Sequence, residues 1–172
     1  EKLRAMPLMD EPFLPGLPAA PLHWHIADRA GAFVAEPTGE GVRVYADPVG
    51  VLTNEPPFPF HLANLSQYLG LSAAQPRGRA PAPELEPFGQ GMGAGGLPGD
   101  WSPASRYVRA AFCLRHSVCP PEEESAVAQF FHLLDAVSMP RGAVRTEEGW
   151  DITRYVCCIN TRTGTYRYRT YD

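Results

Sequence analysis

Proline sets the limits within which this chain can form helices and strands. Its 172 residues include 19 prolines, and most of them gather in residues 7–21, 56–59, 76–98 and 120–121. Proline removes a backbone donor and disfavours helix at the preceding residue, so such clusters are typical of connections between elements. Because the stretches between the clusters keep regular apolar patterns, we interpret the clusters as loops of a folded chain.

The first of these stretches predicts a group of strands. Residues 22–28 alternate apolar and polar side chains, and residues 32–36 and 41–45 follow as two further strands after short turns. Residues 49–53 are largely apolar and predict a fourth strand, central in a sheet. That strand ends abruptly in the polar residue Asn54.

The middle of the chain predicts helices separated by one long loop. Residues 60–69 carry leucines at helical spacing. Residues 72–99 are rich in glycine, proline and alanine and show no periodicity, which favours a loop. Ser102 is a good N-cap for a helix that carries Arg106 near its start. Acidic residues after the proline pair at 120–121 favour the first turn of another helix.

Two alternating segments close the chain. Residues 152–159 and 165–171 predict the strands of a hairpin, joined by a turn at residues 160–164. The order of strands, then helices, then strands is typical of a layered α+β domain rather than of alternating βαβ units. The length fits a single domain that spans residues 1–172.

Composition excludes several classes of partner and site. The formal net charge is −4 and no run is rich in Lys or Arg, which argues against a nucleic-acid partner. The apolar stretches are too short to span a membrane. The four cysteines lack CxxC or Cys/His ligand spacing, so we expect reduced, buried thiols of a cytoplasmic protein and no metal site. No cofactor is expected.

Two polar residues stand where an element could present them to a ligand. The amide of Asn54, at the end of the predicted strand, could donate to a developing oxyanion, or bond its own backbone in a turn. Arg106 could hold a carboxylate or favour a neighbouring thiolate, or form a structural ion pair. Taken alone, the residues favour the turn and the ion pair.

The histidines carry no recognisable catalytic spacing. His23 and His25 lie two residues apart and could ligate a metal, but no third ligand is evident. His61, on a predicted helix, has no Ser or Cys partner at a telling spacing. A Ser/His/Asp assembly stays open, because such triads are defined in space.

Short runs along nearly the whole chain resemble, in order, the choloylglycine hydrolase family, which includes bile salt hydrolases and penicillin V acylases. The matching runs are residues 21–24 and 26–28, 48–56, 61–65 with Tyr68, 96–100, 105–112, 129–135, 139–142, and 157–158 with Tyr166 and 170–172.

The resemblance implies a four-layer αββα fold of the N-terminal-nucleophile hydrolase type, incomplete in this chain. In such enzymes a processed N-terminal cysteine supplies the attacking thiolate, and its α-amino group supplies the base. The chain begins with Glu1, so we expect an internal fragment, the central and C-terminal part of the domain. The nucleophile is then not present in this chain, and the fragment alone is inactive.

The resemblance also assigns roles to individual residues. Asn54 corresponds to the asparagine that helps to build the oxyanion hole, and Arg106 to an arginine close to the nucleophile. The loop at residues 9–21, with Phe13, Leu14 and Leu17, resembles the family's substrate loop, whose apolar side chains would hold a sterol or acyl body. These assignments reverse the interpretation that the two polar residues favour when taken alone.

The function implied is hydrolysis of the amide bond of conjugated bile salts, the glycine and taurine conjugates. Penicillin V or another acyl amide is an alternative substrate, and a non-catalytic, truncated bile-salt-binding domain is an alternative of another class. The only expected ligand is a small-molecule amide, with no nucleic-acid or membrane partner. The complete bacterial protein is expected to be cytoplasmic and to form a homo-oligomer such as a tetramer.

Overall fold

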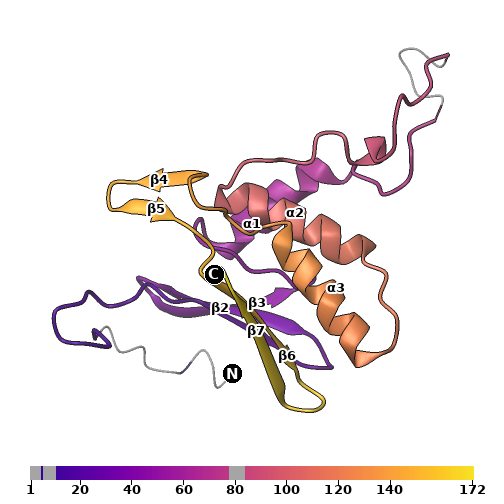
Figure 1. Cartoon of the computed structure of the whole chain (residues 1–172). Coiled ribbons are helices and arrows are strands. Elements are labelled where there is room, and N and C mark those ends of the chain that lie inside the picture. The colour runs from indigo at the N-terminus through magenta and orange to yellow at the C-terminus, as the bar shows by residue number, and fades with distance from the viewer. Residues whose placement is uncertain (1–4, 6–10, 78–83) are drawn as a thin grey trace.

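The computed structural model describes residue 5, residues 11–77 and residues 84–172. Residues 9 and 10 of the predicted substrate loop and residues 78–83 of the predicted long loop lie outside this part. Helices and strands follow the predicted order, with three strands, then three α-helices, then four strands (Figure 1). The described residues therefore confirm an α+β arrangement.

Three antiparallel strands form a meander in the order β1–β2–β3, with bounds Trp24–Ala27, Ala32–Thr38 and Gly41–Asp47. Val34 on β2 pairs with His25 and Tyr45, so these three side chains share one face. That face packs on the helices, because Val34 is fully buried in a cluster with Phe58 and Tyr107.

The predicted strand at residues 49–53 is wrong. The described structure has no strand there, and the backbone turns instead, with Gly50 at φ +81°. The carboxylate of Asp47 accepts the backbone N–H groups of Val49 at 2.8 Å and Gly50 at 3.0 Å. In a strand, these N–H groups would bond to a neighbouring strand, so the side chain of Asp47 competes with strand pairing.

Helix α1 (Phe58–Leu65) continues into a short 3₁₀ turn, η2 (Ser66–Tyr68), close to the predicted helix at residues 60–69. Both carboxylate oxygens of Glu36 on β2 accept the first helical N–H, that of Phe58, at 3.0 and 3.1 Å. A second 3₁₀ turn, η3 (Met92–Ala94), lies in the long loop. The buried carboxylate of Glu36 thus fixes the start of α1 on the sheet.

Helix α2 (Pro103–His116) begins as predicted, because the side chain of Ser102 accepts the N–H of Ser105 at 3.3 Å. Helix α3 (Glu123–Asp135) starts with the predicted acidic residues, but none of its residues is fully buried. Phe130, an apolar residue of α3, is 42% exposed.

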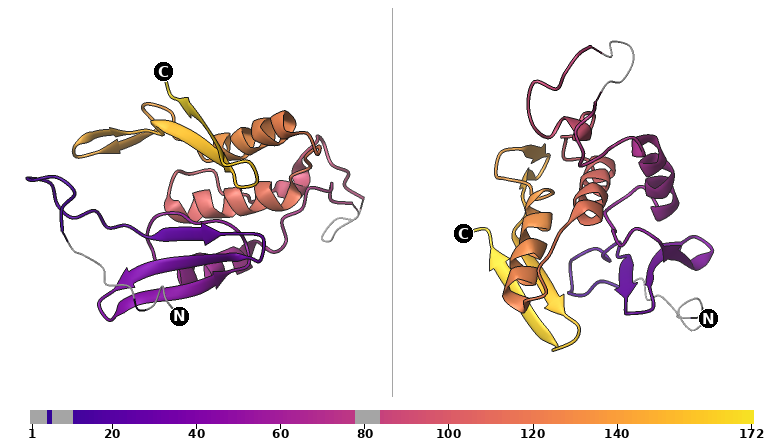
Figure 2. Two further views of the ribbon diagram at one scale, coloured as in Figure 1. Left: turned by 90° about the horizontal axis from the view of Figure 1, so that it is seen from below. Right: turned by 90° about the vertical axis from the view of Figure 1, so that its right-hand side faces the viewer.

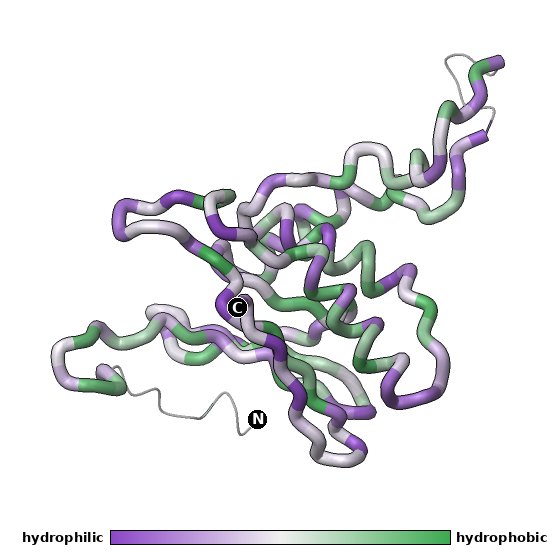
Figure 3. Tube along the Cα trace, in the orientation of Figure 1, coloured by the Kyte–Doolittle hydropathy of each residue, from purple (hydrophilic) through white to green (hydrophobic). Residues whose placement is uncertain are grey.

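Strands β6 (Tyr155–Asn160) and β7 (Thr165–Thr170) confirm the predicted hairpin. The hairpin packs against α3 (Figure 2), with Cys158 buried and Arg167 paired with Glu124 at 2.8 Å. A shorter hairpin, β4 (Val144–Thr146) with β5 (Gly149–Asp151), was not predicted. Figure 3 shows hydrophilic residues at the tip of this shorter hairpin.

The meander and the β6–β7 hairpin each keep an apolar face that no described element covers. Trp24, Ile26 and Phe33, on the face of the meander opposite Val34, are 38 to 46% exposed. On the β6–β7 hairpin the exposed aromatic and aliphatic side chains are those of Tyr155, Ile159, Tyr166 and Tyr168. Among the described residues no helix is long and apolar enough to cross a membrane.

Candidate active site

Asn54 and Arg106, which are 52 positions apart in the sequence, lie in direct contact. Nη2 of Arg106 donates a hydrogen bond to Oδ1 of Asn54 at 2.6 Å. Both residues line one open pocket of about 720 Å³, together with Asp151 from β5. The two residues that the sequence singled out therefore belong to one site.

The guanidinium of Arg106 is oriented by two hydrogen bonds. Besides the bond to Asn54, its Nε donates to the carbonyl oxygen of Trp101 at 3.1 Å. Burial lowers the pKa of Arg106, while the nearby carboxylate of Asp151 raises it. Because arginine is strongly basic, the group keeps its charge at neutral pH, and it presents that charge in a fixed direction.

The contact also decides how the Asn54 amide is turned. A guanidinium only donates hydrogen bonds, so the atom that faces Arg106 must be the side-chain oxygen of Asn54. The other end of the amide, the Nδ2 group, makes no hydrogen bond to any described residue. Asn54 thus offers a free N–H donor beside a fixed positive charge, which is the combination that stabilises an oxyanion.

The turn before α2 is held by a carboxylate and two hydroxyls. Oδ1 of Asp100 accepts the N–H of Ser102 at 2.9 Å, and Oδ2 accepts the hydroxyl of Ser105 at 2.5 Å. Hydrogen bonds from Ser102 and Ser105 lower the pKa of Asp100 to about 2. This network fixes the helix start that places Arg106 in the first turn.

Arg109 supports the site through its hydrogen bonds, a role that no sequence pattern predicted. It is buried, its Nη1 donates to the carbonyl oxygens of Pro98 at 2.9 Å and Asp100 at 2.6 Å, and its Nε donates to that of Ala136 at 2.9 Å. Its guanidinium lies 5.1 Å from the centre of the Trp101 ring. Arg109 therefore ties the residues before α2, including the carbonyl that orients Arg106, to the end of α3. In the sequence, only the spacing of Arg109, three positions after Arg106 on the same helix, points to a role near Arg106.

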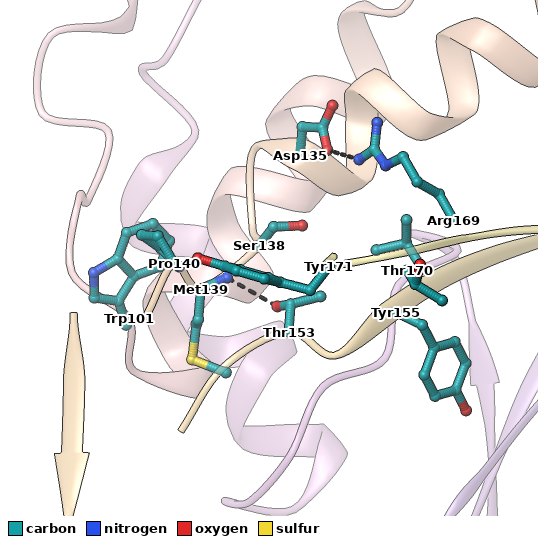
Figure 4. A pocket seen from close by; sticks show the side chains of 11 residues that line it. Trp101, Asp135, Ser138, Met139, Pro140, Thr153, Tyr155, Arg169, Thr170 and Tyr171 are labelled. Carbon is teal, nitrogen blue, oxygen red and sulfur yellow. Dashed lines mark hydrogen bonds and ion pairs between the residues drawn. The ribbon is translucent and has the colours of Figure 1, made fainter. Parts of the chain in front are cut away.

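A second, smaller pocket (Figure 4) shares two lining residues, Trp101 and Met139, with the Asn54–Arg106 pocket. The backbone N–H of Met139 donates to the hydroxyl of Thr153 at 2.8 Å. Asp135, at the end of α3, pairs with Arg169 on β7. The hairpin and the end of α3 thus hold the segment that forms a wall of both pockets.

The other predicted site residues lie elsewhere. Phe13, Leu14 and Leu17 are exposed, and none of them lines the Asn54–Arg106 pocket among the described residues. Their role in holding substrate stays a prediction. His25 is paired with Asp47 at 2.9 Å. No group of three or more His, Cys, Asp or Glu among the described residues is arranged to hold a metal ion.

The four cysteines are free thiols, and none lines the Asn54–Arg106 pocket in the described structure. Burial raises the pKa of the Cys113 thiol, which makes it a poorer nucleophile at neutral pH. Cys158 is buried under α3, but Cys119 is exposed, so the expectation of buried thiols is wrong for Cys119. The described part of the site thus provides groups that can stabilise charge, and the cysteines of this chain lie outside it.

Comparison with known proteins decides the family. The whole chain, residues 1–172, matches the family of linear amide C–N hydrolases described as the choloylglycine hydrolase family. This chain belongs to the choloylglycine hydrolase family. It is 40% identical over 174 residues to a bile salt hydrolase/transferase of Lactiplantibacillus plantarum, covering 100% of this chain and 54% of that protein. A bile salt hydrolase/transferase of Clostridium perfringens is 42% identical over 176 residues, covering 100% of this chain and 53% of that protein.

Two solved structures superpose on this chain. A mutant conjugated bile acid hydrolase from Clostridium perfringens superposes with a TM-score of 0.82 at 43% identity, covering 94% of this chain and 50% of that chain. A penicillin V acylase from Agrobacterium tumefaciens gives a TM-score of 0.67 at 21% identity, covering 87% and 42%, which is a likeness of fold alone. The chain spans about half the length of the curated relatives it matches.

Proposed function

We propose that the protein to which this chain belongs hydrolyses the amide bond of conjugated bile salts. The observation that carries the proposal is the Asn54–Arg106 contact, which leaves the Asn54 amide N–H free beside a fixed guanidinium. Three relatives at 37 to 42% identity, named as bile salt hydrolase/transferase or conjugated bile acid hydrolase, support this choice of substrate. The likeness to a penicillin V acylase is one of fold alone, so that substrate is second.

In the proposed reaction, a cysteine thiolate supplied by a segment outside this chain attacks the amide carbonyl carbon. The carbonyl oxygen gains the negative charge, and Nδ2 of Asn54 donates to it. As the carbon–nitrogen bond breaks, the amine takes a proton and leaves, and a thioester remains. Water then releases the bile acid and the thiol. Arg106 contributes by favouring the thiolate and by holding the oxygen of the Asn54 amide away from the oxyanion.

We also propose that strands outside this chain cover the exposed faces of its sheets. The meander and the β6–β7 hairpin each pack against helices on one face and expose apolar side chains on the other, among them Trp24, Ile26 and Phe33. A face of this kind is normally covered by a further layer. Because the chain covers only 53 to 54% of its first relatives, we assign the covering strands of a four-layer αββα domain to the remaining half. Residues 1–172 are then the central and C-terminal part of that single domain.

The compartment and assembly are also part of the proposal. Four free thiols are consistent with a reducing compartment, which supports a cytoplasmic protein. A homo-oligomer is the expected assembly of the complete protein. Size-exclusion chromatography coupled to light scattering measures its mass directly, and a monomeric mass would remove that expectation.

The test is an activity panel on the product of the complete gene. Glycocholate, taurocholate and penicillin V are supplied separately, and released glycine, taurine and phenoxyacetate are quantified. We expect release of glycine or taurine in preference to phenoxyacetate. Asn54→Ala should retain the fold while its turnover falls roughly 10²–10³-fold, the cost of removing one oxyanion donor. Absence of amine release by a correctly processed protein would refute the proposed substrate.

A further inference from the structure

His61 is a fully buried polar residue that the proposed reaction does not use. It lies on α1 with an exposed fraction of 0%, and it does not line the Asn54–Arg106 pocket. Its Nε2 lies 2.9 Å from the backbone oxygen of Asn54. A carbonyl oxygen only accepts, so Nε2 must carry a proton and donate it to Asn54.

The imidazole has no other hydrogen bond among the described residues. Its second nitrogen, Nδ1, is buried and unpartnered there. The ring is held by packing, since it stacks on Tyr107 with centroids 5.0 Å apart and an angle of 21°, and Phe60 meets it edge-on at 5.6 Å. The bond to Asn54 is thus the one polar interaction that this buried ring makes within the described structure.

Two separate links therefore join Asn54 to α2. The side-chain oxygen of Asn54 bonds Arg106, and the backbone oxygen bonds His61, whose ring stacks on Tyr107. Tyr107 follows Arg106 directly in the helix and is fully buried. Asn54 itself lies in an irregular segment outside any strand or helix, so no ladder of backbone hydrogen bonds fixes it.

We infer that His61 is a positioning residue, which holds the backbone of Asn54 so that its amide N–H meets the oxyanion. The inference rests on the proposed function. An oxyanion donor must lie within about 2.7–3.1 Å of the charge, so a small shift of the Asn54 backbone removes most of its effect. A misplacement of about 1 Å costs roughly a hundredfold in rate. Because His61 lies outside the pocket, it would act on the reaction by positioning Asn54 and not by contact with the substrate.

The test compares two replacements in the complete protein. His61→Gln keeps a side-chain N–H that can reach the Asn54 carbonyl, whereas His61→Leu keeps apolar bulk and has no donor. We expect His61→Leu to lower kcat for glycocholate about tenfold to a hundredfold with KM nearly unchanged. His61→Gln should recover most of that loss.

A stability control separates positioning from simple unfolding. Phe58→Leu changes another fully buried side chain of α1, one that makes no bond to Asn54. It should lower the melting temperature without changing kcat below that temperature. If His61→Leu keeps kcat within about twofold of the parent, or if Phe58→Leu lowers kcat as much, the positioning role is refuted.

Crystal structures of the variants test the inference even if bile salts are not the substrate. The position of the Asn54 amide relative to Arg106 should shift by about 1 Å in His61→Leu and stay in place in His61→Gln. An unmoved Asn54 in His61→Leu would overturn the inference, whatever the activity panel shows. Conversely, a displaced Asn54 in a protein without turnover would support positioning and refute only the substrate.

Discussion

Oδ1 of Asn54 accepts a hydrogen bond from Nη2 of Arg106 at 2.6 Å, and this bond joins the segment after the meander to the first turn of α2. The bond fixes which end of the Asn54 amide faces the guanidinium, so the N–H end is left for a substrate. Neither residue alone gives this arrangement.

Asp100 should make stability depend on pH in the acid range. Hydrogen bonds from Ser102 and Ser105 lower its pKa to about 2, from an ordinary value of 3.8. A carboxyl whose pKa falls on folding contributes stability that is present above the ordinary pKa and is lost as pH falls through the folded value. The melting temperature of the complete protein should therefore fall between about pH 4 and pH 2 in part because of this group.

Asp100→Asn tests that contribution. The variant should melt at a lower temperature than the parent at pH 7, and the difference should narrow as pH falls from about 4 towards 2. Glu84→Gln, which alters an exposed carboxylate, is the control and should show no such narrowing. A constant difference between parent and Asp100→Asn from pH 7 to pH 2 would show that the Asp100 network does not contribute as described.

The cysteines of this chain should react at different rates and contribute no nucleophile. Cys119 is exposed, whereas Cys158 is buried and the pKa of Cys113 is raised by burial. Among the cysteines of this chain, Ellman's reagent or iodoacetamide followed by peptide mass spectrometry should therefore label Cys119 first. Replacement by Ala of any one of the four, Cys113, Cys119, Cys157 or Cys158, should keep turnover within about threefold of the parent. A loss of several hundredfold in any one would place a nucleophile inside this chain.

Glu36 should stabilise the join between the sheet and α1. Its two buried oxygens accept the N–H of Phe58 at 3.0 and 3.1 Å. Glu36→Leu leaves this donor buried without an acceptor, so the free energy of unfolding should fall by about 1–3 kcal/mol. Glu36→Gln keeps one acceptor oxygen and should lose less. Urea denaturation measures both, and equal stability of Glu36→Leu and the parent would contradict the assignment.

Gly93 should tolerate no side chain. A Cβ at this position would lie 1.9 Å from the backbone oxygen of Ala74 and 2.5 Å from that of Ser72. Because both are backbone atoms, Gly93→Ala should lower the free energy of unfolding by about 1–3 kcal/mol. Gly89→Ala, in the same loop with open space around the added atom, is the matched control and should be nearly neutral. Similar stabilities of the two variants would contradict the close approach at Gly93.

The alternating segments of the sequence predicted most of the fold. The first strand of the meander and both strands of the β6–β7 hairpin follow from period-two patterns, because a strand with one buried and one exposed face alternates apolar and polar side chains. The predicted strand at residues 49–53 is wrong. The apolar pattern does not reveal that the side chain of Asp47 accepts the backbone N–H groups of Val49 and Gly50. The β4–β5 hairpin has three-residue strands, too short to show any period.

The site was predictable only in part. Resemblance to a family brought Asn54 and Arg106 forward, but their contact depends on how distant segments pack, which no local pattern encodes. Arg109 and His61 carry no motif either. Both residues act through backbone carbonyl oxygens on other segments. Arg109 bonds those of Pro98, Asp100 and Ala136, and His61 bonds that of Asn54. Hydrogen bonds of this kind become visible only in the folded chain.

The most direct test of the account is a double-mutant cycle on the complete protein. Asn54→Ala, Arg106→Ala and the double variant are compared with the parent by kcat/KM for glycocholate. Because the two residues act as a unit, each single variant should lose roughly 10²–10³-fold, and the double variant should lose little more than the worse single one. Losses that multiply in the double variant, or near-parental activity in either single variant, would contradict a shared role of Asn54 and Arg106.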